Sequence, residues 1–343
     1  MEKRVVYVDL LKIIATFSVI LLHVAASNWG NVILGSYEWN VMNFYDSIAR
    51  FGVPIFVMSS GLFMLNTNKI VSIKSIFSKY ILRILIAFVS WSLLYAVYTN
   101  ITQHDIFSMD VFFKSFIFGH YHLWYLYMII GLYIITPLLR SIVASKIETE
   151  YFLLLSFILT SLLPIIIKYF DLVDLDLFLK KFDLHFTLGY VGYYIIGYYL
   201  NEYELKESKR NIIYVLGVLG IICTYIFTNI ISIKTGKADS TFYSNFSPNV
   251  VFVSIAIFVF FKYEISRMHF NENVIKIITV ISACTFRIYL VHDFFNMFIA
   301  KLGISTLTYN PLVSIPFIAV IVFICSLTVS YIIGKTPLLK RIL

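Results

Sequence analysis

Two ionisable side chains, Lys12 and His23, lie within the first long apolar segment of this 343-residue chain. A charged or titratable group costs a few kcal/mol at the centre of a bilayer, so such groups usually face a protein interior or a water-filled cavity. The eleven-residue step between them covers about 16 Å of helix axis and three turns, which puts both on nearly the same face. Asp9 falls close to that face as well. The spacing predicts a polar stripe with an acid and a base near one end and an imidazole toward the other.

Other polar and aromatic side chains lie in the outer halves of later apolar segments. A histidine or tryptophan at the start of a segment is often a cap or an interfacial anchor, and an arginine there often extends its charge to the interface. The sequence Gly52-Val53-Pro54, which begins two residues after Arg50, indicates a shaped and broken helix entrance. The residues in question are Arg50, His120, His122, Trp124, His185, Arg287, Tyr289 and His292.

The elements that must position these side chains are membrane-spanning helices. Hydrophobic residues make up 60% of the chain and charged residues only 13%, a balance unlike that of soluble globular domains. Apolar runs long enough to cross a hydrocarbon core recur from end to end. The longest polar connections are predicted on the outside, at 28–44 and 99–120. We predict an all-α polytopic bundle of about ten spans, near 8–27, 45–65, 78–98, 121–142, 150–169, 184–201, 211–232, 247–262, 278–300 and 311–333.

The orientation follows from the charged loops. Most of the 27 Lys and Arg residues lie in loops on one side of an even number of spans, and the positive-inside rule then puts both termini in the cytoplasm. The net charge of +8 is thus a topology signal, and we expect no nucleic-acid partner. We expect one integral membrane domain over 1–343, embedded in a lipid bilayer.

Motifs of soluble enzymes are absent from the sequence. There is no Gly-rich phosphate loop, no Ser nucleophile elbow and no zinc-protease motif. The three cysteines, Cys223, Cys284 and Cys325, lie inside predicted spans without metal-binding spacing. We expect no metal ion, and any chemistry should take place in the bundle or at its mouth.

Four stretches, taken together, resemble the acyltransferase-3 family of membrane acyltransferases. They begin at Val8 and lead to His23, run from Arg50 to Gly61, run from His122 to Leu126, and run from Ser282 to His292. Within that family the chain looks most like stand-alone surface-polysaccharide O-acetyltransferases, including the enterobacterial common antigen type. The resemblance implies a bacterial plasma membrane enzyme that moves an acetyl group from cytoplasmic acetyl-CoA to a sugar hydroxyl of a surface polysaccharide or lipid-linked glycan.

The resemblance also implies roles for individual residues. His23 is expected to act as a general base, or to carry the acyl group itself, with Arg50 or His122 stabilising the thioester oxyanion. Lys12, with Asp9, is expected to bind the CoA donor. The family has Arg at the position of Lys12, and Lys lacks the bidentate fork that grips a phosphate, although it can bind one as a point charge. Substrate-binding roles are expected for Trp124, Arg287, Tyr289 and His292.

Two alternatives stay open at this stage. Ten helices with broken entrances and buried basic groups also suit a proton-coupled carrier or glycan exporter. The scarcity of acidic residues inside the spans and the lack of two halves with matching interruptions count against a carrier. Another acyl donor, such as succinyl-CoA, is also compatible with the resemblance.

Overall fold

Every regular element of the part of the chain described by the computed structural model, residues 5–69, 71–103, 107–181 and 189–336, is helical. The prediction of an all-α fold is therefore confirmed. The elements are α1 (Val6–Ala26), α2 (Tyr37–Ala49), α3 (Gly52–Met64), α4 (Ile73–Ser75), η1 (Ile76–Ile81), α5 (Leu82–Gln103), α6 (Met109–Phe118), η2 (Tyr121–Leu123), α7 (Trp124–Val143), α8 (Lys146–Ser156), η3 (Phe157–Leu162), α9 (Leu163–Phe170), α10 (Val173–Lys180), α11 (Val191–Glu202), α12 (Glu207–Thr235), η5 (Thr241–Tyr243), α13 (Pro248–Tyr263), η6 (Ile265–Arg267), α14 (Glu272–Lys301) and α15 (Pro311–Lys335).

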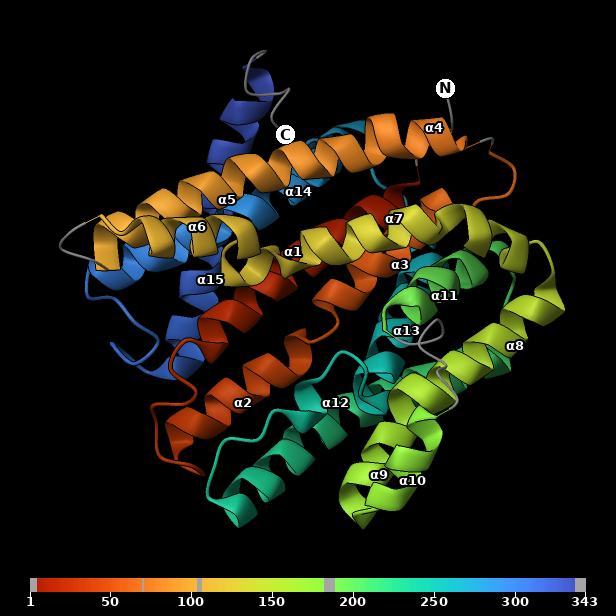
Figure 1. The fold of residues 1–343 in the computed structure, drawn as a ribbon, viewed down its shortest axis with the longest axis horizontal. Coiled ribbons are helices and arrows are strands. Elements are labelled where there is room, and N and C mark those ends of the chain that lie inside the picture. The colour runs from red at the N-terminus through yellow and green to blue at the C-terminus, as the bar shows by residue number, and fades with distance from the viewer. Residues whose placement is uncertain (1–4, 70, 104–106, 182–188, 337–343) are drawn as a thin grey trace.

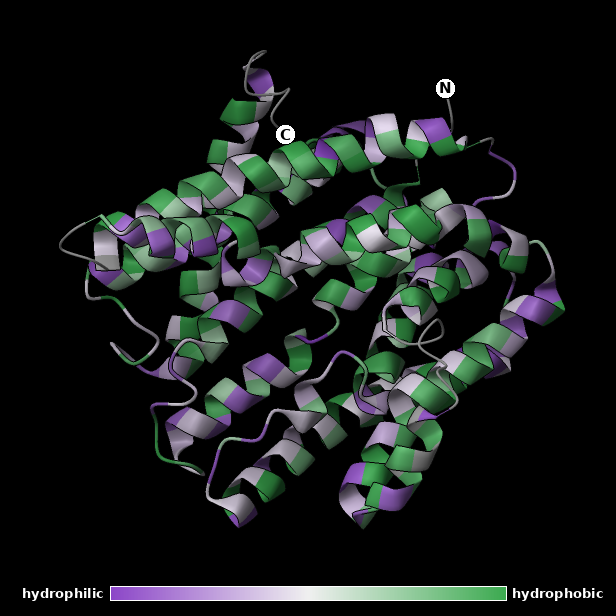
Figure 2. Ribbon diagram, viewed as in Figure 1, coloured by the Kyte–Doolittle hydropathy of each residue, from purple (hydrophilic) through white to green (hydrophobic). Residues whose placement is uncertain are grey.

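Nine helical stretches within the described ranges are long and apolar enough to cross a bilayer. They correspond to nine of the ten predicted spans. The tenth predicted span, 184–201, begins outside the described residues and continues as α11. His185 also lies outside the described residues. Figure 2 shows apolar residues along much of α5 and α7, with hydrophilic residues in several connections and on parts of helices such as α2. The chain is a polytopic membrane protein.

The two long connections predicted at 28–44 and 99–120 contain helical segments. Helix α2 begins at Tyr37, inside the 28–44 connection, because the Ser36 side chain caps it by accepting a hydrogen bond from the Trp39 backbone N–H. Helix α6 lies inside the 99–120 connection. Its apolar, phenylalanine-rich sequence packs against α5, and burial of that face favours a helix over a solvated loop.

Helix α1 lies at the centre of the bundle. It packs against α14, α3, α2 and α15. In Figure 1, α1, α3 and α7 lie in the middle of the view. Helices α5 and α6 lie above them, and α9, α10 and α12 lie below. The junction between α2 and α3 approaches α1 at Gly52, where a Cβ atom would meet Val19 and the Ala15 carbonyl. The polar stripe on α1 therefore faces protein on most of its length.

Helices α3 and α11 touch backbone to backbone. A Cβ atom at Gly61 would collide with the Tyr194 carbonyl, and one at Gly197 would collide with the backbone of Met58. Small residues at such crossings let membrane helices approach closely and gain van der Waals contact. This contact holds α3, which carries part of the cavity described below, in a fixed position.

A methyl group at this crossing should destabilise the bundle. We expect Gly197→Ala to cost about 1–3 kcal/mol, because the backbone of Met58 cannot move aside. The measurement is the thermal midpoint of the detergent-solubilised protein, followed by size-exclusion chromatography. The matched control is Gly131→Ala, since a Cβ atom there meets nothing within 4 Å. Equal midpoints for both variants would contradict the tight crossing.

Candidate active site

Four histidines from three separate segments meet in the interior and form what we call the histidine cluster. His23 comes from α1, His120 and His122 from the turn before α7, and His292 from α14. The rings of His23 and His292 stack with centroids 5.3 Å apart, and those of His122 and His292 lie 5.1 Å apart. His122 and His292 are buried, whereas His23 and His120 are half-buried. His23 and His120 are thus the members that stay open to a substrate.

The turn before α7 is what brings His120 and His122 into the cluster. Gly119 adopts a left-handed backbone with φ +73°, which few other residues tolerate. The chain then passes from an extended conformation at His120 into the short helix η2. The Tyr289 hydroxyl donates to the carbonyl of His122, and this bond ties η2 to α14.

An aromatic stack supports the same turn from the side of α5. The Tyr95 ring stacks on His120 with centroids 4.4 Å apart and on Phe294 at 4.0 Å. Its hydroxyl donates to the Leu290 carbonyl at 3.0 Å. The buried Tyr95 ring therefore packs between η2 and α14 and fixes the distance between them.

Tyr121 joins His23 to a buried carboxylate. Its hydroxyl donates to Asp293 Oδ1 at 2.8 Å and lies 3.4 Å from His23 Nδ1. Because the single hydroxyl proton is used toward Asp293, the oxygen is left to accept from an N–H at His23 Nδ1. This arrangement puts the ring proton of neutral His23 on Nδ1 and leaves Nε2 with a lone pair, the tautomer that a general base requires.

Asp293 has three neighbours of different kinds. Besides Tyr121, the side-chain amide of Asn296 donates to Oδ1 at 3.3 Å. Oδ2 lies 3.4 Å from His120 Nδ1, and His120 Nδ1 lies 3.0 Å from His122 Nδ1. Asp293 is 4% exposed. The carboxylate thus faces a phenol and an amide with one oxygen and an imidazole pair with the other.

A cavity of about 350 Å³ adjoins the histidine cluster. Tyr289 belongs to both, since it lines the cavity and donates to the backbone of His122. Lys12 and Arg83 line the same cavity, and Lys12 Nζ lies 4.7 Å from the centroid of the Phe63 ring. Lys12 lies in the half of α1 predicted to be cytoplasmic. The cavity therefore holds two basic side chains, and its wall residue Tyr289 contacts the rings of His122 and His292.

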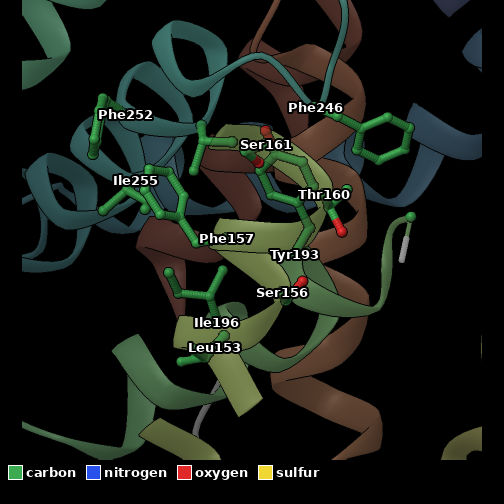
Figure 3. A pocket seen from close by; sticks show the side chains of 13 residues that line it. Leu153, Ser156, Phe157, Thr160, Ser161, Tyr193, Ile196, Phe246, Phe252 and Ile255 are labelled. Atoms are coloured by element: carbon green, nitrogen blue, oxygen red, sulfur yellow. The ribbon is translucent and has the colours of Figure 1, made fainter. Parts of the chain in front are cut away.

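A second cavity, of about 210 Å³, lies among α8, η3, α11 and α13. Figure 3 shows mainly aromatic and aliphatic side chains around it, with the hydroxyls of Ser156, Thr160 and Ser161. None of the described residues that line it is acidic, basic or a histidine. Its chemistry is that of an apolar pocket, and we do not assign the reaction to it.

Two predicted site arginines make contacts of their own outside the histidine cluster. Arg50 pairs with Asp46 one helical turn earlier and stacks on Tyr243 with its guanidinium carbon 4.0 Å from the ring centroid. Arg287 hydrogen-bonds to the Ala283 carbonyl of its own helix.

Trp124 and Asp9 also make structural contacts. Trp124 is 40% exposed and packs on Tyr190. Asp9 accepts a 2.6 Å hydrogen bond from Ser282, which itself lines the large cavity. Asp9 thus supports the cavity wall by linking α1 to α14.

The geometry brings together His23, His122, Tyr289 and His292 from the predicted set, and puts Lys12 at the adjoining cavity. It adds Tyr121, Asp293 and Arg83, for which sequence reasoning assigned no role. Tyr121 lies between two histidines and Asp293 follows a third. The sequence signal that could have identified them was therefore their position next to candidate histidines. Arg83 was counted among the positive charges that indicate which side of the membrane is cytoplasmic.

One of the comparisons with known proteins identifies a family. An acyltransferase domain family, acyltransferase-3, matches residues 5–335. The chain belongs to this family of membrane acyltransferases. No curated protein and no solved structure matches the chain.

Proposed function

We propose that this protein transfers an acetyl group from cytoplasmic acetyl-CoA to a hydroxyl of a bacterial surface polysaccharide or lipid-linked glycan. The observation that carries the proposal is the cavity that holds Lys12 and Arg83 and adjoins the histidine cluster. Membership of the acyltransferase-3 family supports acyl transfer over the alternative of a carrier. We place the enzyme in the bacterial plasma membrane, with both termini in the cytoplasm.

The donor enters from the side of Lys12. The phosphates of CoA are anionic, and ammonium and guanidinium groups bind phosphate. The step from Lys12 to His23 covers about 16 Å along α1, so an extended pantetheine arm, anchored at its phosphates by Lys12 and Arg83, brings the thioester toward the histidine cluster. Tyr125, Tyr133 and Tyr289 line the cavity with aromatic rings and hydroxyls and exclude bulk water.

The reaction then proceeds at His23. Nε2 takes the proton of the acceptor hydroxyl as its oxygen attacks the thioester carbonyl. The tetrahedral intermediate collapses, the carbon–sulfur bond breaks, and the imidazolium returns the proton to the CoA thiolate. His122 Nε2 is buried and has no hydrogen-bond partner among the described residues, so it is the donor that we assign to the developing oxyanion. Arg50, engaged with Asp46, is less suited to this role.

The test is a transfer assay with membranes that contain the protein. Labelled acetyl-CoA is supplied on the cytoplasmic face, and both free CoA thiol and label in the envelope glycan are measured. Label and thiol should appear together, and succinyl-CoA and propionyl-CoA serve as competing donors. Folded protein that releases no thiol from any of these donors, with candidate glycans present, would overturn the proposal.

The charge of Lys12 should control donor affinity. We expect Lys12→Met to raise the KM for acetyl-CoA about 10- to 100-fold, since a hydrogen bond between charged groups contributes about 1.5–3 kcal/mol. Lys12→Arg should keep or lower the KM because it restores the planar fork. The control is Lys69→Met, because Lys69 lies near the same Phe63 ring but does not line the cavity. A fall in kcat at unchanged KM in Lys12→Met would contradict a donor-binding role.

A further inference from the structure

The buried carboxylate of Asp293 carries a negative charge that a nearby positive charge must balance. The carboxylate is 4% exposed, and buried charges in proteins are paired or coordinate metals. Among the described residues no lysine or arginine forms an ion pair with it, and its ionisable partner is the His120 ring. Its negative charge is therefore balanced by a protonated imidazole or by an ion that the surrounding ligands hold.

We propose that His120, His122 and Asp293 bind one divalent transition-metal ion of the zinc type. Their ligand atoms lie within 4.8 Å of one another. The two Nδ1 atoms are 3.0 Å apart, and His120 Nδ1 is 3.4 Å from Asp293 Oδ2. Ligands about 2.0–2.1 Å from a tetrahedral zinc ion are separated by about 3.3–3.4 Å, so two of the three edges already approach that spacing.

The second coordination sphere fits the same assignment. Asp293 Oδ1 is occupied by the Tyr121 hydroxyl and the Asn296 amide, which turns Oδ2 toward the two imidazoles. Hydrogen bonds of this kind to a ligating carboxylate are typical of metal sites. The backbone of His122 is held by Tyr289 and the ring of His120 by Tyr95. The ligands are thus positioned by rigid neighbours.

Three protein ligands leave a fourth position open, as in zinc sites that also bind water or substrate. Coordination through Nδ1 requires the proton of His122 to be on Nε2, the buried atom without a partner among the described residues. The ion would also balance the charge of Asp293 while leaving Oδ1 bonded to Tyr121. The proposal stands on this geometry and does not depend on the acyl-transfer proposal.

Metal content tests the site directly. The protein is purified in detergent with an affinity tag that contains no histidine, dialysed against a weak chelator, and analysed by inductively coupled plasma mass spectrometry before and after addition of Zn²⁺ or Co²⁺. We expect one ion per chain in the wild type and none in His122→Ala or Asp293→Asn. Tyr121→Phe should bind Co²⁺ about 10- to 100-fold more weakly, as for other lost outer-sphere partners. The control is His269→Ala, which removes an exposed histidine and should keep full occupancy.

A ligand exchange keeps the test decisive if an alanine variant does not fold. His120→Cys supplies a thiolate, so its Co²⁺ complex should gain an intense sulfur-to-metal charge-transfer band that the wild type lacks. A wild type that takes up neither ion, or a metal content that is the same in folded Asp293→Asn, would overturn the site. So would a Co²⁺ spectrum of His120→Cys identical to that of the wild type.

The outcomes separate this inference from the proposed function. His23→Gln should lose acetyl transfer but bind one ion per chain, because His23 is not a ligand. An active wild type that takes up neither Zn²⁺ nor Co²⁺ would refute the metal site alone. A wild type that binds one ion but transfers no acyl group would refute the proposed function alone.

Discussion

His23→Gln should lower acetyl transfer by about 10²–10⁴-fold or more, because glutamine has no titratable nitrogen to take the proton of the acceptor hydroxyl. The KM for acetyl-CoA should change little, since His23 does not line the donor cavity. The measurement is kcat and KM for thiol release in membranes with matched amounts of folded protein. His269→Gln, at an exposed position, is the matched control and should behave as the wild type.

The same variant separates two mechanisms. If His23 carries the acetyl group, rapid quenching of the wild type with acetyl-CoA and no acceptor should give a chain heavier by one acetyl group, and His23→Gln should not. If His23 acts only as a base, no acetylated chain accumulates. Near-normal transfer by His23→Gln would contradict both mechanisms, and attention would pass to His292, whose ring stacks on that of His23.

Asp293→Asn should lower kcat by about 10²–10⁴-fold with little change in the KM for acetyl-CoA. An amide in place of the carboxylate can turn its N–H toward the Tyr121 oxygen. Tyr121 then donates to His23 and no longer holds the proton of His23 on Nδ1. In the Ser-His-Asp triad of serine proteases, replacing the aspartate by asparagine costs about 10⁴-fold through the wrong histidine tautomer. The geometry is analogous, with one phenol inserted between the imidazole and the carboxylate.

The control for this prediction is Asp110→Asn. Asp110 forms an exposed ion pair with Lys114 on α6, and exposed pairs contribute little to stability. Tyr121→Phe should give a smaller loss than Asp293→Asn, because it removes the bridge but keeps the carboxylate. Wild-type kcat in folded Asp293→Asn would show that the orientation of His23 does not depend on this chain of hydrogen bonds.

The spans and half of the site could be predicted from sequence because bilayer burial leaves a strong signal. Lys12 and His23 stand out as ionisable groups in an apolar segment, and His292 does so in α14. That these residues lie close together could be seen only in the tertiary structure. Their proximity depends on helices that are distant in sequence, and on the Gly119 turn that places η2 against α14.

Tyr121 and Asp293 could not be assigned a role from sequence, since both lie beside more conspicuous histidines and their function rests on one hydrogen bond between them. The role of Arg50 in the site stays a prediction. The structure pairs it with Asp46, which lies four residues earlier on the same helix face. An i, i+4 pair of this kind is visible in the sequence. Charge pairing within α2 was therefore the interpretation that the local spacing favoured.

The half-buried ring of His23 lies between the cavity of Lys12 and the predicted outer surface. This position determines how much net charge crosses the membrane in each turnover. In the proposed reaction the proton leaves an acceptor outside and departs on a CoA thiol inside, while the acetyl group moves the other way. Each turnover is therefore electroneutral. The enzyme would acylate a glycan on the far side of the membrane without drawing on the transmembrane potential, and the thioester alone would drive the reaction.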